Sequence, residues 1–167
     1  MAKRKINEKG LLCLIIGVIL VILILFFSIK LLFGGASGIV NDYAKGMKNF
    51  DSEMLVDLYI DEMIKESYDS EEDMIKEFDS MFEEMENNYF QIISYDVNKS
   101  YKEYEGEELD YKINQLEEYY KIEETDIKEI RRYTVIFDCS VDSEMKEVEH
   151  KVNVAKIKNK WYFIGTE

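Results

Sequence analysis

Proline is absent from this chain of 167 residues, and cysteine, histidine and glycine are scarce. Without proline, the helices and strands that the sequence encodes meet no obligatory break. The two cysteines are Cys13 and Cys139, so the chain after residue 35 holds one thiol and no internal disulfide. Most glycines cluster between residues 10 and 46, and none forms a phosphate-binding loop.

Positive charge is also scarce beyond the N-terminus. Five of the 21 basic residues and one of the 35 acidic residues fall within residues 1–35, so the rest carries a net charge of −18 (16 basic against 34 acidic). Nucleic-acid recognition needs a basic face, so this class of partner is excluded. Disorder is excluded as well, because twelve tyrosines and nine phenylalanines supply the aromatic content that disordered chains lack.

One long apolar run is present, from Leu11 to Phe33, interrupted only by Lys30. A helix of this length extends roughly 34 Å, which spans a hydrocarbon core of about 30 Å. The side chains are apolar on every side of the helix, as lipid contact requires. The sequence therefore predicts a single transmembrane helix over 11–33, with Lys30 snorkelling to the headgroups.

The flanks of this run predict its orientation. Residues 1–10 carry Lys3, Arg4, Lys5 and Lys9 against Glu8, and no basic cluster follows the run. Positive residues stay in the cytoplasm, so the N-terminus is predicted inside and the C-terminal domain outside. A cleaved signal peptide is the alternative, but its apolar core is typically about 7–15 residues long. The following segment, 34–38, is predicted as a flexible joint to one domain over 39–167.

Four segments of that domain carry apolar residues at helical spacing, over about 37–48, 53–64, 71–87 and 107–120. Asp51 or Ser52 is placed to cap the second helix, and Ser70 the third. The acids after Ser70 suit the first turn of a helix. They lack the glycine and the ligand spacing of a calcium loop, so no metal site is predicted there.

Alternation of apolar and polar residues predicts strands over about 90–103, 133–141, 148–154 and 161–164. The pattern slips near Ser94, and it shifts again at 155–157, which predicts a bulge. Short turns between the last three strands predict an antiparallel meander. Helices segregated from an antiparallel sheet define an α+β fold.

The order of these elements and the closing run Val152–Ile164 (VNVAKIKNKWYFI) resemble the NTF2-like (cystatin-like α+β) superfamily, especially its small domains on bacterial membrane-anchored proteins. The resemblance covers about residues 36–167 and rests on pattern, without invariant chemistry. It implies helices packed on a curved antiparallel sheet that surrounds a pocket. Some members are isomerases or dehydratases that need a buried acid or histidine, and many others act as binding or assembly modules.

Candidate site residues are few. His150, the only histidine, lies on an apolar strand face, where it is the one candidate for acid–base chemistry near neutral pH. Tyr133 and Trp161 join His150 as possible pocket or interface residues. Cys139 alternates with apolar neighbours and is predicted buried. The pair Arg131–Arg132 is interpreted as charge that protects a strand edge.

No motif indicates a cofactor, a metal or a catalytic residue set. The leading hypothesis is a non-enzymatic, membrane-anchored binding or assembly module that takes a protein partner or a small apolar ligand outside the cytoplasm. One alternative is an NTF2-like pocket enzyme that uses His150 or a buried acid. Another is a single-pass component of a conjugation or secretion machinery.

Overall fold

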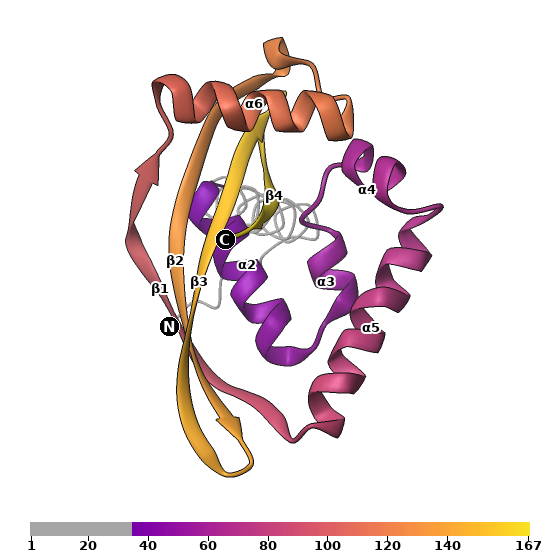
Figure 1. Cartoon of the computed structure of the whole chain (residues 1–167), viewed down its shortest axis with the longest axis vertical. Helices are drawn as coiled ribbons and strands as arrows, with labels where there is room; N and C mark the ends of the chain where they lie inside the picture. The colour runs from indigo at the N-terminus through magenta and orange to yellow at the C-terminus, as the bar shows by residue number, and fades with distance from the viewer. Residues whose placement is uncertain (1–34) are drawn as a thin grey trace, which may run out of the picture. The chain divides into compact units, whose positions relative to one another are not determined.

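Helices precede most of the sheet in this computed structural model, which describes residues 35–167 (Figure 1). The helices before the first strand are α2 (Ala36–Asn49), α3 (Ser52–Val56), α4 (Asp61–Ser67) and α5 (Glu71–Asn87). The elements that follow are β1 (Phe90–Glu103), α6 (Gly106–Tyr120), a 3-10 turn (Glu124–Asp126), β2 (Ile127–Val141), β3 (Glu144–Ile157) and β4 (Lys160–Thr166). The predicted α+β class is confirmed.

The four strands form one curved antiparallel sheet in the order β1-β2-β3-β4 (Figure 1). The predicted meander of the last three strands is therefore confirmed, with β1 added beside β2. The outer edge of β4 is partly covered, because the amide of Phe163 donates to the carbonyl of Leu58 at 2.9 Å. β1 forms the other edge, and its two register shifts interrupt the ladder that a foreign strand would extend.

Bulges lie partly where the sequence placed them. The slip near Ser94 is confirmed, because the register with β2 shifts between Ile92 and Ser94. A register shift does lie at the predicted 155–157, but the extra residue is Lys128 of β2, opposite Lys156 and Ile157, and not a residue of β3. A second extra residue, Ile164, lies in β4. The apolar pattern changes there because that end of β3 is buried on both sides, not because the strand flips.

Two apolar clusters account for this double burial. The α2 face of the sheet carries Tyr133, Val135, Phe137 and Cys139, with Val152 and Val154 beside them, and it packs against α2 and α5. The α6 face carries Ile130, Ala155 and Ile157, which pack with residues of α4 and α6. Figure 1 shows α6 lying across one end of the sheet. Cys139 is buried, as predicted.

The helix boundaries differ from prediction in two places. α2 already begins at Ala36, so the last three residues of the predicted joint are helical. The predicted helix over 53–64 is two helices, because its side chains serve both clusters: Leu58 packs on the α2 face, while Ile60 and Met63 pack on the α6 face. A straight helix could not reach both faces around the edge of β4.

Helix caps follow the sequence closely. The Asp51 carboxylate accepts from the amide of Met54 at 3.0 Å at the start of α3. The Ser70 hydroxyl accepts from the amide of Asp73 at 3.2 Å at the start of α5. Both predicted caps are confirmed, and the acids after Ser70 form the first turn of a helix.

The predicted transmembrane helix over 11–33 lies outside the described residues. Within residues 35–167, no helix is long and apolar enough to cross a membrane.

Candidate functional site

Aromatic side chains fill the space between α2 and the sheet, where the resemblance implied a pocket. The ring of Tyr43, on α2, stacks on Phe163 of β4 with centroids 4.9 Å apart and planes 12° apart. Tyr59 meets the same Phe163 ring edge-on at 5.0 Å. Phe137 of β2 approaches Tyr43 at 6.4 Å in an edge contact. These four rings occupy the centre of the α2 face.

A second aromatic group seals the side of the α2 face toward α5. Phe50, just beyond α2, stacks on Phe82 of α5 at 4.8 Å, and Phe78 lies 6.4 Å from Phe82. Phe50 adopts a left-handed backbone conformation (φ 53°) as the C-cap of α2. A non-glycine residue in this conformation costs on the order of 1 kcal/mol, which the stacking of its ring offsets.

His150 lies at the margin of these rings. The Tyr43 hydroxyl lies 2.8 Å from His150 Nδ1, and the Phe137 ring meets the imidazole in a T-shaped contact at 5.1 Å. Burial lowers the pKa of His150 from its ordinary value of 6.5, so the imidazole is neutral at pH 7. Burial also raises the pKa of the Tyr43 hydroxyl, which keeps it protonated as a donor. In the described residues, no carboxylate hydrogen-bonds to His150.

Tyr133 and Trp161 are connected to each other through Arg131 and Tyr101, and not through the Tyr43–His150 pair. The Arg131 guanidinium lies 4.2 Å from the ring centroid of Tyr101 and 4.9 Å from that of Trp161. Tyr101 in turn lies 5.3 Å from Tyr133. Arg131 also forms an ion pair with Glu129. These cation–π contacts join three strands. The aromatic rings and Glu129 already surround the Arg131 guanidinium.

The interpretation of Arg131 and Arg132 as edge charges is wrong, because β2 is a central strand. Successive side chains of a strand point to opposite faces. Arg131 therefore lies among aromatic rings on the α2 face, while Arg132 reaches Glu167 on the α6 face at 2.9 Å.

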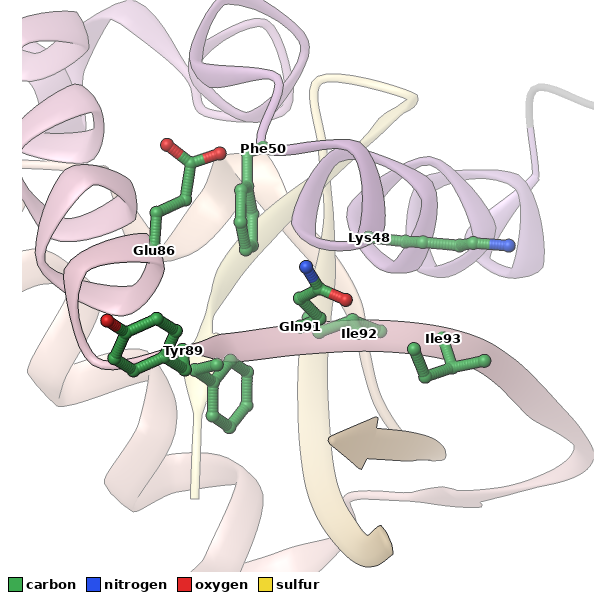
Figure 2. A pocket seen from close by; sticks show the side chains of 8 residues that line it. Lys48, Phe50, Glu86, Tyr89, Gln91, Ile92 and Ile93 are labelled. Carbon is green, nitrogen blue, oxygen red and sulfur yellow. The ribbon is translucent and has the colours of Figure 1, made fainter. Parts of the chain in front are cut away.

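An open hollow of about 390 Å³ lies where α2 and α5 end and β1 begins (Figure 2). Its lining residues are Lys48, Phe50, Glu86, Tyr89, Phe90, Gln91, Ile92 and Ile93. Figure 2 shows Glu86 and Lys48 on opposite sides of Phe50. Two apolar side chains of the hollow are exposed, Tyr89 at 75% and Ile93 at 46%. This rim hollow, as we call it, was missed by the sequence analysis.

Only weak sequence signals marked the rim hollow. Tyr89 follows the end of a helix and takes a left-handed conformation (φ 53°), which is uncommon for an aromatic residue. Ile93 is the extra residue of the β1 bulge, and the slip near Ser94 pointed to it. Bulges often re-aim a side chain at a functional site, so the slip was the one usable signal.

Within residues 35–167, no group of three or more histidine, cysteine or acidic side chains is placed to hold a metal ion. Comparisons with family models, with curated proteins and with solved structures find no match to this chain.

Proposed function

We propose that this protein is a non-enzymatic, membrane-anchored binding or assembly module of NTF2-like type, which presents the rim hollow to a protein partner outside the cytoplasm. The observation that carries the proposal is the filled α2 face. Tyr43, Phe137 and Phe163 occupy the position where a pocket enzyme of this fold would bind its substrate. The rim hollow, in contrast, is open and carries two exposed apolar side chains, Tyr89 and Ile93.

The NTF2-like assignment is supported by the order of elements. Helices precede a strand, a further helix and an antiparallel meander, and the helices cover a curved sheet. The hairpin from β3 to β4 turns at Lys158–Asn159 and leads into Trp161. This hairpin includes the run Val152–Ile164, which resembles the superfamily most.

The rim hollow has the composition of a protein-binding site. Tyrosine is enriched among the residues that dominate binding energy, and Tyr89 is the most exposed large apolar side chain of the described residues. Glu83, Glu84 and Glu86 are exposed on the adjoining end of α5. A partner with an apolar side chain for the hollow and a basic rim matches this surface, because complementary charge favours encounter.

Site-specific photo-crosslinking in native membranes tests the proposal. A photoreactive phenylalanine replaces Tyr89 in one variant and Tyr119, another exposed tyrosine, which lies on α6, in the control. We expect discrete protein adducts from position 89 that are absent from position 119 and weakened by adding Ile93→Glu. Equal adducts from both positions, or none, would contradict the proposed interface.

The membrane anchor and its orientation need a separate test. External protease applied to right-side-out vesicles should remove the domain and leave an N-terminal tag protected. Protection of the domain in these vesicles would reverse the predicted orientation and remove the extracytoplasmic part of the proposal.

A pocket enzyme remains the second candidate, because the Tyr43–His150 contact at 2.8 Å resembles a general base with an orienting hydroxyl. It requires the aromatic rings to move aside and admit a substrate. Titrating the protein with small apolar ketones, while following both the NMR signals of the His150 imidazole and the exchange of the ketone α-protons, distinguishes the two. A saturable shift with α-proton exchange that His150→Gln abolishes favours the enzyme, and an unchanged signal without exchange favours the binding module.

A further inference from the structure

Hydrogen-bond donors from four parts of the chain meet at the side-chain carboxylate of Glu167, one residue beyond β4. Lys112 Nζ, on α6, and the Tyr104 hydroxyl each lie 2.9 Å from Glu167 Oε1. Arg132 Nη1, on β2, donates to Oε2 at 2.9 Å. Asn153 Nδ2, on β3, donates to Oε1 at 3.3 Å. Both carboxylate oxygens are therefore bound, from elements that are distant in sequence.

Two of these donors are buried. Tyr104 is 5% exposed and Asn153 is 3% exposed, and Asn153 is one of two buried polar residues of the described domain. The Tyr104 hydroxyl also lies 2.9 Å from Asn153 Oδ1, so its single proton serves two acceptors. Buried polar groups without a partner are costly, so the fold maintains these groups around an anion.

Three cationic groups surround the Tyr104 ring in a domain that is otherwise strongly acidic. Those of Lys102, Lys112 and Arg132 each lie 5.5–5.7 Å from its centroid. Lys102 is paired with Glu108, so Lys112 and Arg132 supply the positive charge at the carboxylate. The hydrogen bond from Lys112, with those from Tyr104 and Arg132, lowers the pKa of Glu167 to about 2. Burial and the same carboxylate raise the pKa of Tyr104 to about 12. The cluster thus favours a bound negative charge.

The cluster is reachable from solvent. A hollow of about 370 Å³ opens beside it. Tyr104, Lys112, Arg132 and Glu167 form one part of its wall, and Glu107, Glu108 and Tyr111 form the other. The Glu167 side chain is 35% exposed, and Tyr111 at the mouth of the hollow is also exposed. A carboxylate from solution therefore has a route to the donors that Glu167 occupies.

We propose that Lys112, Arg132, Tyr104 and Asn153 form a carboxylate-binding site, which the side chain of Glu167 fills in this structure. When Glu167 is withdrawn, an external carboxylate binds the same donors. That carboxylate belongs to a small organic acid or to an acidic side chain of a protein. The inference concerns a different surface from the rim hollow and does not depend on it.

Chemical rescue of Glu167→Ala tests the site in the full chain in detergent. The substitution removes the methylene and carboxylate of Glu167, which are the atoms of acetate. We expect the Tm of this variant to lie below that of the parent and to rise with added acetate. A Kd on the order of 10 mM would raise the Tm by about 5 °C at 100 mM acetate. Acetamide, which is neutral and similar in shape, should have no effect at matched ionic strength.

Two controls test whether the rise in Tm with acetate comes from binding at this site. The parent protein should not respond to acetate, because Glu167 already fills the site. The double variant Arg132→Gln/Glu167→Ala should not respond either, because the donor to Oε2 is lost. The proposal is overturned if acetamide acts like acetate, or if either control responds as strongly as the single variant. If Glu167→Ala is unfolded at 25 °C, the same titration is followed as recovery of folded protein by Trp161 fluorescence.

The source of the carboxylate is resolved by a second ligand, the peptide acetyl-Gly-Glu-Gly-amide. Binding to Glu167→Ala at least tenfold tighter than acetate indicates a protein side chain that also uses the hollow near Tyr111. Equal binding indicates a small organic acid. Binding by neither ligand overturns the proposal.

Discussion

Replacing Tyr43 by alanine or by phenylalanine tests whether the α2 face is as closed as its aromatic contacts indicate. Tyr43 is 6% exposed, its ring stacks on Phe163, and its hydroxyl lies 2.8 Å from His150 Nδ1. Tyr43→Phe removes only the hydroxyl. Tyr43→Ala removes the ring as well and leaves a cavity between α2 and the sheet. The pair of variants therefore separates the packing of the ring from the hydrogen bond.

The two variants should lose different amounts of stability. A neutral hydrogen bond contributes about 0.5–1.5 kcal/mol, so Tyr43→Phe should lower the free energy of unfolding by about 1 kcal/mol. Removing a buried aromatic ring costs about 3–5 kcal/mol through lost transfer energy and the cavity left behind. For a domain of this size, 1 kcal/mol corresponds to about 3–4 °C in Tm. Tyr43→Ala should therefore lower the Tm by roughly 10–18 °C.

Urea unfolding of the full chain in detergent measures these losses. Trp161 is the only tryptophan of the chain, so its fluorescence reports on this domain alone. The cavity of Tyr43→Ala is lined by apolar groups and should bind benzene, which raises the urea midpoint of this variant but not of the parent. A loss below about 1.5 kcal/mol for Tyr43→Ala would mean that the α2 face is not tightly packed, and it would favour the pocket enzyme.

Three further predictions concern local features. Ser70→Ala removes the cap of α5 and should cost about 1 kcal/mol in urea unfolding, whereas the exposed control Ser80→Ala should cost less than half of that. Asp142→Asn with Ser143→Gly should stabilise by about 0.5–1 kcal/mol, because both turn residues have positive φ (50° and 69°), which the new pair adopts readily. Because burial lowers the pKa of His150 in the folded state, the unfolded chain binds more protons below about pH 6.5. Stability should thus fall between pH 7 and 5.5, and His150→Gln should reduce this fall; an unchanged fall would assign it to other groups.

Much of the fold could be predicted from the sequence, because capping residues, charge and apolar spacing indicated the same elements. α5 has a serine cap, acids in its first turn and apolar residues at helical spacing, and its observed bounds are the predicted ones. The long alternation of β1 predicted its full extent. The break between α3 and α4 could not be predicted, because Leu55, Leu58, Tyr59 and Met63 recur at the spacing of one helix. The separation of the two helices depends on two clusters that form only when the sheet closes.

The functional sites were harder to predict from the sequence, because they depend on contacts between distant segments. The alternation of β3 placed His150 on an apolar strand face, and it lies there against Phe137. Its partner Tyr43 lies 107 residues away, and no local pattern connects them. Glu167 appears in the sequence as one acid among 35. Its low pKa arises only where α6, β2 and β3 bring their donors together.

Arg131 and Arg132 show why neighbouring residues can serve unrelated sites. In a central strand, adjacent side chains point to opposite faces, and each face of β2 is covered. Arg131 therefore meets Tyr101 and Trp161, while Arg132 meets Glu167. Because the two guanidinium groups have no shared partner, their effects on stability should be close to additive. Measured coupling above about 0.5 kcal/mol between Arg131→Met and Arg132→Met would mean that the sheet transmits strain from one face to the other, and the two faces could then not be treated as independent surfaces.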